Sequence, residues 1–108
     1  MGLAKQAEEY CLAKLSLNAK PSKYIAGFTT RLGRQLAIER VRGAIYCWTE
    51  HTSLSAAPCS PVALYPASKT RTSALNGKHA SRLGIGQAAQ YWRFEHFEEF
   101  KRFIEWYA

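Results

Sequence analysis

Two histidines and an adjacent glutamate are the side chains in this sequence best suited to proton transfer. His51 directly follows Glu50, and His79 lies in a basic segment further along the chain. An imidazole ionises near neutral pH, so His51 and His79 could act as general acid and base in RNA cleavage, with Glu50 as an alternative base. Four cations in the segment around His79 could stabilise the developing negative charge: Lys69, Arg71, Lys78 and Arg82.

No spacing in the sequence joins these groups into one catalytic unit. A nucleophile and its base are not set at a characteristic separation, and the chain has no lysine loop of the Walker type. The pair Gly84 and Gly86 lacks the third glycine and the preceding strand of a dinucleotide site. We therefore expect a protein that is not an enzyme, and keep a small metal-independent ribonuclease or toxin as an alternative.

A zinc site is the second chemical possibility that the residue types raise. Cys47, His51 and Cys59 could be three ligands, with His79 or His96 as the fourth. Their C-x3-H-x7-C spacing matches none of the common paired-ligand patterns, and the chain contains no CxxC pair. All eight acidic residues are glutamate, which excludes any site that needs an aspartate. We expect no metal and no cofactor.

The cysteines and the hydropathy pattern indicate the compartment. Cys11, Cys47 and Cys59 are too few and too scattered for a secreted disulfide framework. The first residues lack the uninterrupted apolar run of a signal peptide, and no stretch approaches the ~18 apolar residues of a membrane span. We expect a cytoplasmic protein with reduced, mostly buried thiols and no membrane partner.

Positive charge is concentrated in two parts of the chain. The sequence has 15 Lys and Arg against 8 acids, for a net charge of +7. Residues 10–38 and residues 51–94 each carry five Lys or Arg and no acid. Such a balance favours a polyanionic partner, because Lys and Arg neutralise phosphates and release counterions.

The segment 68–82 is the part of the sequence most typical of a phosphate-binding loop. It supplies Lys, Arg, Ser, Thr and Asn side chains, all of which donate hydrogen bonds to phosphate oxygens, and it has no competing carboxylate. Because it lacks long apolar runs and strong periodicity, we expect folding to make little use of its cations. The predicted partner-binding cations are Lys69, Arg71, Lys78, Arg82, Arg93, Arg31 and Arg34.

Aromatic residues give a weaker indication of the same partner. Exposed rings can stack on bases, although rings near strands more often belong to the core. The rings near strands or basic segments are Tyr24, Tyr46, Trp48, Tyr65, Tyr91 and Trp92. Trp106 lies opposite the phenylalanine stripe of the last predicted helix, so either another segment covers it or it contacts a protein partner.

Periodicity predicts the elements that must position these residues. Residues 3–17 and residues 25–36 show helical spacing, and residues 40–51, 62–65 and 90–96 read as strands. Residues 67–89 show no long element, with one or two helical turns around 72–83. From Phe97 a final helix carries an apolar stripe that places Phe100, Phe103 and Ile104 in the core.

The order α-α-β-β-β-α predicts one α+β domain over residues 1–108, with an irregular basic loop at about 67–89. About three helices would pack on a short antiparallel sheet of about three strands. No RNA-recognition, KH, zinc-finger or basic-zipper motif is present. We expect a small basic, non-catalytic protein that binds nucleic acid or a nucleoprotein complex through phosphate-contacting Lys and Arg.

A second hypothesis belongs to another class of function. A phage or mobile element could encode such a protein as an inhibitor of a host defence nucleoprotein complex, comparable to an anti-CRISPR protein. An inhibitor that mimics DNA would be acidic, whereas this chain is basic. It would therefore act by protein–protein contact with an acidic protein surface, or bind the guide RNA.

Overall fold

The computed structural model describes residues 2–40, 42–50, 62–71, 75, 77–80, 82–84 and 86–108, with Gly77 and Lys78 described by their backbone alone. In chain order its elements are α1 (Leu3–Lys14), β1 (Ser16–Leu17), β2 (Ile25–Thr29), β3 (Gln35–Glu39), β4 (Ile45–Glu50), β5 (Ala63–Tyr65), α2 (Gly77–Ala80), β6 (Ala89–Phe94) and α3 (Phe97–Tyr107). The strands form one antiparallel sheet in the order β1-β2-β3-β4-β6-β5.

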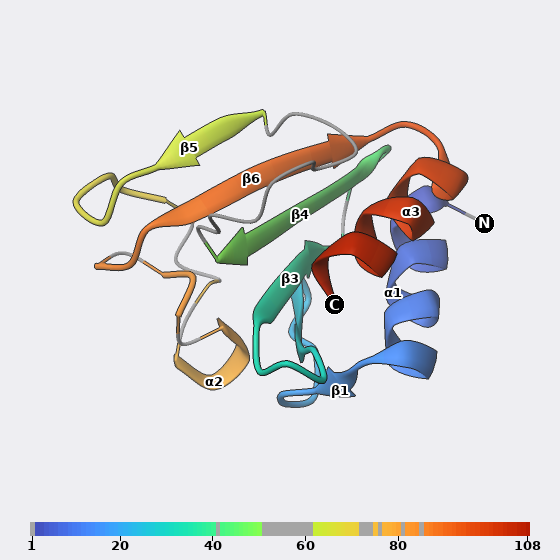
Figure 1. The fold of residues 1–108 in the computed structure, drawn as a ribbon, viewed down its shortest axis with the longest axis horizontal. Helices are drawn as coiled ribbons and strands as arrows, with labels where there is room; N and C mark the ends of the chain where they lie inside the picture. Colours follow the sequence, from blue (N-terminus) through green and yellow to red (C-terminus); the bar gives the residue numbers. More distant parts are fainter. Residues whose placement is uncertain are drawn as a thin grey trace.

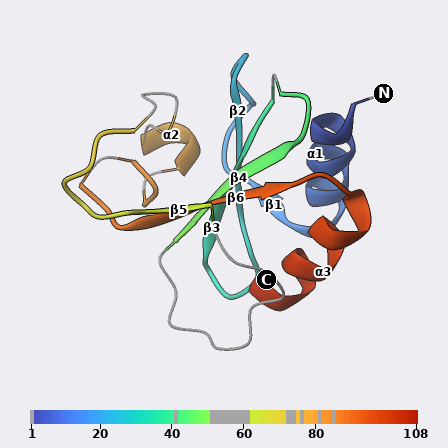
Figure 2. The same cartoon turned by 90° about the horizontal axis from the view of Figure 1, so that it is seen from above.

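The two faces of this sheet are covered by different parts of the chain. Helices α1 and α3 lie together on one face, and the short helix α2 lies on the other (Figure 1, Figure 2). The core under α1 and α3 includes the expected Phe100, Phe103 and Ile104, whose burial is confirmed. Among the described residues, no helix is both long and apolar enough to cross a membrane.

The expectation of three helices on a three-stranded sheet is wrong. The structure is α+β, but its described residues form two long helices, one helical turn and a six-stranded sheet. Residues 25–36, expected as a helix, form β2, the turn that follows it and the start of β3. Strand β2 is buried on both faces, so its apolar run does not show the alternation typical of a half-exposed strand.

The turn between β2 and β3 explains the rest of that error. Leu32, which completed the helical spacing, is 69% exposed at the tip of the turn. Gly33 has a φ of 84°, a left-handed conformation that glycine adopts without strain. The backbone N–H of Thr30 donates to the Arg34 carbonyl at 2.8 Å and closes the hairpin.

The remaining elements match the sequence expectations to different degrees. The predicted first helix ends at Lys14 because Ser16 and Leu17 pair with β2 as strand β1. The strands expected at 40–51, 62–65 and 90–96 correspond to the shorter β4, β5 and β6, and the last helix is confirmed as α3. Within the predicted irregular loop, α2 is a single helical turn.

Helix α2 approaches β2 more closely than a side chain on the strand would allow. A Cβ atom added at Gly27 would collide with the carbonyl oxygen of His79 in α2. The same carbonyl accepts a hydrogen bond from the Asn18 amide at 2.7 Å. The absence of a side chain at Gly27 therefore lets α2 lie directly on the sheet. There Ala80 packs with Ile25 and Ala37 in a second buried apolar cluster.

We expect Gly27→Ala to destabilise the protein by about 1–3 kcal/mol or more, because the new methyl group meets backbone atoms that cannot move without shifting α2. The matched control is Gly43→Ala, where an added Cβ meets nothing within 4 Å and the change should stay within about 0.5 kcal/mol. Urea unfolding of the two variants measures the difference. Equal free energies of unfolding would show that α2 does not rest on β2.

Candidate nucleic-acid interface

A row of aromatic side chains crosses the face of the sheet opposite α1 and α3. Cys47 and Trp92 are paired in register and buried beneath the helices, so their strand neighbours point to the other face. Those neighbours include Trp48, which is paired with Tyr91. The aromatic row consists of Tyr46 and Trp48 from β4, Tyr91 from β6 and Tyr65 from β5.

The rings of the aromatic row contact one another continuously. Tyr46 stacks on Tyr91 with ring centroids 5.6 Å apart. Trp48 lies 4.4 Å from Tyr91 and 4.7 Å from Tyr65, centroid to centroid. Trp48 is buried, whereas the three tyrosines are half-buried and keep part of their rings at the surface. The row therefore combines a buried tryptophan with three tyrosines that are accessible in part.

Cations lie over the rings at both ends of the row. At one end, the guanidinium carbons of Arg42 and Arg93 lie 4.0 Å and 5.8 Å from the Tyr46 centroid. At the other end, Lys69 Nζ lies 4.5 Å from the Tyr65 centroid. Each of these distances is within the range of a cation–π interaction. The arrangement offers aromatic and cationic groups side by side on one surface.

Hydrogen bonds and burial shift the pKa values of Tyr46 and Tyr91 in opposite directions. Hydrogen bonds from Arg42 and Arg93 lower the pKa of the Tyr46 phenol, since a donated hydrogen bond stabilises the phenolate. Burial, reinforced by the nearby carboxylate of Glu39, raises the pKa of Tyr91. Tyr46 is therefore the ring that faces cations, and Tyr91 the ring enclosed by its neighbours.

Two carboxylates lie close to the row, and both are paired. Glu39, whose side chain is 15% exposed, accepts a hydrogen bond from Trp48 Nε1 at 3.0 Å and pairs with Arg42 at 3.3 Å. Glu95 is exposed and pairs with Arg93 at 2.9 Å. An ion pair between exposed groups contributes little, about 0–1 kcal/mol, so an incoming anion can compete with the pair of Arg93 and Glu95.

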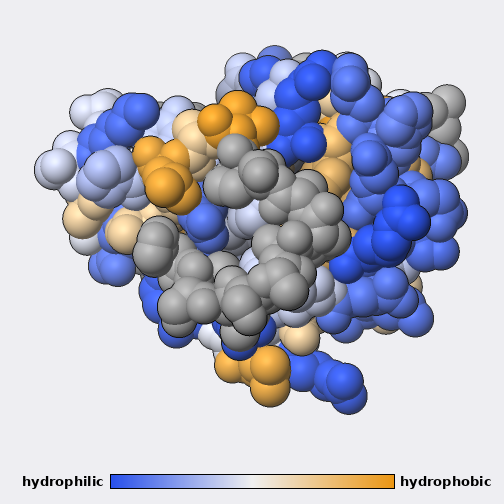
Figure 3. Space-filling view, turned by 45° about the horizontal axis from the view of Figure 1, so that its top comes forward, coloured by the Kyte–Doolittle hydropathy of each residue, from blue (hydrophilic) through white to orange (hydrophobic). Residues whose placement is uncertain are grey.

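An apolar hollow adjoins the Tyr65 end of the row. It has a volume of about 260 Å³ and is lined by Leu64, Tyr65, Pro66, Ala88 and Ala89. Leu64 is more than half exposed, and apolar surface is visible along this side of the molecule (Figure 3). A flat apolar ring fits such a surface better than a charged group does.

Of the predicted binding cations, Arg93 and Lys69 lie at the aromatic row. The Arg71 guanidinium instead binds backbone carbonyls of two other segments. Although Arg71 lies 5.3 Å from the Tyr65 centroid, its guanidinium donates to the carbonyls of Pro66 at 2.7 Å and Leu83 at 3.0 Å. These bonds hold the segment after β5 against the segment after α2. The expectation that folding makes little use of this side chain is wrong.

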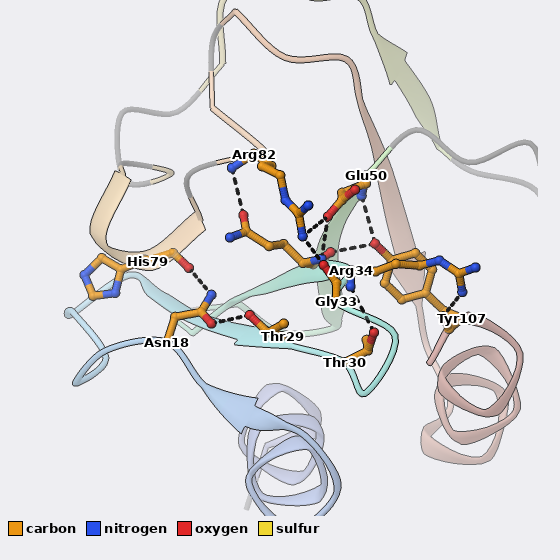
Figure 4. Close-up of polar contacts among 10 residues, drawn as sticks. Asn18, Thr29, Thr30, Gly33, Arg34, Glu50, His79, Arg82 and Tyr107 are labelled. Atoms are coloured by element: carbon orange, nitrogen blue, oxygen red, sulfur yellow. Dashed lines mark hydrogen bonds and ion pairs between the residues drawn. The ribbon is translucent and has the colours of Figure 1, made fainter.

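Arg82 and Arg34 are engaged in a polar network around Glu50 (Figure 4). The Glu50 carboxylate accepts a hydrogen bond from the Gln35 N–H at 2.7 Å and pairs with Arg82 at 2.9 Å. The Tyr107 hydroxyl accepts from the Glu50 N–H at 3.0 Å and donates to the Gln35 carbonyl at 2.6 Å. Arg34 donates to the Tyr107 carbonyl at 2.7 Å. This network joins β3, β4, α3 and the segment after α2.

The other predicted contact residues lie apart from the row. Arg31 is exposed and lines a hollow between α1 and α3 together with Lys14. Trp106 is half-buried and packs against Trp92 at 6.1 Å and Phe103 at 5.6 Å, so the core of the protein covers part of it. The side chain of Lys78 lies outside the described residues.

The described residues do not bring the predicted catalytic groups together. The Glu50 carboxylate is occupied by Gln35 and Arg82, and the buried His79 ring points away from it (Figure 4). His51 lies outside the described residues, as does Cys59 of the zinc hypothesis. No cluster of three or more potential metal ligands occurs within the described ranges.

The sequence does not predict Arg42 as a binding residue, and it indicates Tyr46 only as one of six rings near strands or basic segments. Alternation within residues 40–51 already placed Tyr46 and Trp48 on one face, and alternation within residues 90–96 placed Tyr91 with Arg93. Only the pairing of β4 with β6 shows that these four residues share a surface. Arg42 precedes the strand in a charge-balanced segment, so no local signal distinguished it.

Comparison with known proteins found no matching family model, no matching curated protein and no matching solved structure.

We expect Tyr107→Phe to lower the free energy of unfolding by about 1–3 kcal/mol. The change removes a buried hydroxyl and leaves the Glu50 N–H and the Gln35 carbonyl without their partner. Tyr24→Phe is the matched control, because this hydroxyl belongs to a residue that is 57% exposed. Chemical unfolding of both variants tests this, and an unchanged stability of Tyr107→Phe would contradict the network.

Proposed function

We propose that this protein binds single-stranded nucleic acid on the aromatic row, without a catalytic role. Unpaired bases would stack on Tyr46, Tyr65 and the exposed part of Tyr91. Arg42, Arg93 and Lys69 would neutralise phosphates beside them. The observation that carries the proposal is the placement of cations over the outer rings at both ends of the row.

The chemistry of the row favours single strands over duplexes. A base can stack on a protein ring only when it is unpaired and accessible, and single-strand binders combine aromatic side chains with a positively charged track for the backbone. Sheet-borne aromatics in such proteins stack about two or three bases. Tyr46 and Tyr65 each lie within 6.3 Å of Tyr91, which limits the row to a site of about that size.

Packing alone explains part of this cluster, since cross-strand aromatic pairs stabilise a sheet by about 0.2–1 kcal/mol each. It does not account for the cations, which a purely structural cluster has no need of. The net charge of +7 supports the same conclusion, because it favours polyanions at a distance. A nucleoprotein complex is a compatible partner where it presents an unpaired strand.

We expect the wild-type protein to bind mixed-sequence single-stranded RNA or DNA more tightly than the matching duplex. Three phosphate contacts predict a slope of about −2 for log K against log salt, at about 0.7 per contact. Fluorescence anisotropy of labelled oligonucleotides at several salt concentrations measures both quantities. Absence of binding at low salt, or a preference for duplex, would contradict the proposal.

Loss of one stacking ring should weaken this binding. We expect Tyr65→Leu to reduce the affinity for a single strand about 5- to 150-fold, equivalent to about 1–3 kcal/mol for a stacked base. Tyr24→Leu is the matched control, since Tyr24 is also a tyrosine with a lysine above it, Lys23 at 5.5 Å, but lies outside the row. Thermal melting shows whether each variant is folded. Equal affinities of two folded variants would remove Tyr65 from the site.

A further inference from the structure

Two guanidinium groups converge on one phenol at the Tyr46 end of the aromatic row. Arg93 lies directly opposite Tyr46 in the pairing of β4 with β6, and its Nε donates a hydrogen bond to the Tyr46 hydroxyl at 3.0 Å. The Arg42 guanidinium lies over the same ring at 4.0 Å. Tyr46 therefore contacts both arginines.

Each of these arginines keeps donors for a further acceptor. A guanidinium has five N–H donors in a rigid fork, and one carboxylate uses at most two of them. The carboxylate that pairs with Arg93 belongs to Glu95, whose side chain is 64% exposed. The partner of Arg42 is Glu39, which also accepts a hydrogen bond from Trp48. Both arginines therefore keep N–H donors that these carboxylates do not use.

The two ends of the row differ in what they can hold. At the Tyr65 end, Lys69 offers a single ammonium group, and the guanidinium of Arg71 already binds backbone carbonyls. At the Tyr46 end, two guanidinium groups with forked donors lie at one phenol. A phosphate group presents several acceptor oxygens and is recognised by arginine in bidentate geometry, so its chemistry fits the Tyr46 end.

We propose that Arg42, Tyr46 and Arg93 form a seat for a phosphate group, with both guanidinium groups and the phenol hydroxyl donating to its oxygens. Where that phosphate belongs to a nucleic acid, the proposal rests on the proposed function. The strand would then be anchored by one phosphate at Tyr46, with its bases directed along the row toward Tyr65 and the apolar hollow. The phosphate could be internal or terminal in the strand, which the experiment distinguishes.

The first test uses inorganic phosphate alone and does not depend on nucleic acid. Phosphate is titrated against chloride at matched ionic strength while the Nε–H resonances of the arginines are followed by NMR. We expect saturable shifts of the Arg42 and Arg93 resonances and no such shift of Arg102, which is exposed on α3. Tyr46→Phe should weaken the phosphate affinity several-fold. Unchanged Arg42 and Arg93 resonances would overturn the seat.

The second test uses oligonucleotides with and without a terminal phosphate. We expect the double variant Arg42→Gln, Arg93→Gln to lose about tenfold or more in affinity and to flatten the salt dependence by about 0.7, for the one phosphate of a single strand that both arginines contact. The matched control is Arg31→Gln, Arg102→Gln, which removes the same charge elsewhere. A larger loss for the terminally phosphorylated strand identifies a terminal phosphate, and equal losses identify an internal one.

These outcomes separate the seat from the proposed function. If phosphate shifts Arg42 and Arg93 but the wild type binds no oligonucleotide, the seat stands and nucleic-acid binding is wrong. If the wild type binds single strands and the double variant binds them equally well with the same salt slope, the seat is wrong and the proposed function stands. The phosphate titration of the wild type remains decisive if the double variant does not fold.

Discussion

The pairing of β4 with β6 is the constraint on which the rest of this structure depends. These strands are not consecutive in the chain, yet their six register pairs set both faces of the sheet at once. Cys47 and Trp92 meet under the helices, while Tyr46, Trp48 and Tyr91 meet on the opposite face. A slip of one residue would move every side chain of one strand to the other face, so core and candidate site depend on the same register.

The helices on the two faces of the sheet differ in how much of each face they cover. The face under α1 and α3 is closed by the aromatic side chains of α3, whereas α2 is one turn long and packs on β2 and β3. The close approach at Gly27 brings α2 onto that half of the sheet. Among the described residues, the half formed by β4, β6 and β5 carries the aromatic row, and Trp48 there packs with Leu75 and Leu83 from the segments on either side of α2. The candidate site therefore lies beside this second layer, with its tyrosines only half-buried.

The sequence predicts the features that depend on neighbouring residues, and it does not predict those that depend on contacts between residues far apart in the chain. Local periodicity was sufficient for α3, for the inward residues Phe100 and Phe103, and for the alternation within β4 and β6. It failed for residues 25–36, because a strand buried on both faces shows no alternation and the exposed Leu32 completed a false helical spacing. The register between β4 and β6 joins residues far apart in sequence, and no local pattern encodes it.

The same limit explains why the charge pattern does not distinguish cations at the aromatic row from cations that bind groups of the fold. A run of basic residues shows how much charge a segment carries, but not which acceptors its donors already bind. Arg71 and Arg82 lie in the most basic segment, yet backbone carbonyls and Glu50 engage them. Arg42 comes from a charge-balanced segment, yet its partner acid lies at the edge of the aromatic row.

That difference also bears on how readily the surface can bind an anion. An arginine held by backbone carbonyls must give up those bonds before it can reach a ligand, and the fold loses what they contribute. An arginine held over a ring and beside a carboxylate has already lost much of its rotamer freedom, so ordering it on binding costs less. Arg42 and Arg93 are of this second kind, because Tyr46, Glu39 and Glu95 hold them in place. When a phosphate replaces the carboxylate partner of such an arginine, one anion takes the place of another. The guanidinium group is then already in position.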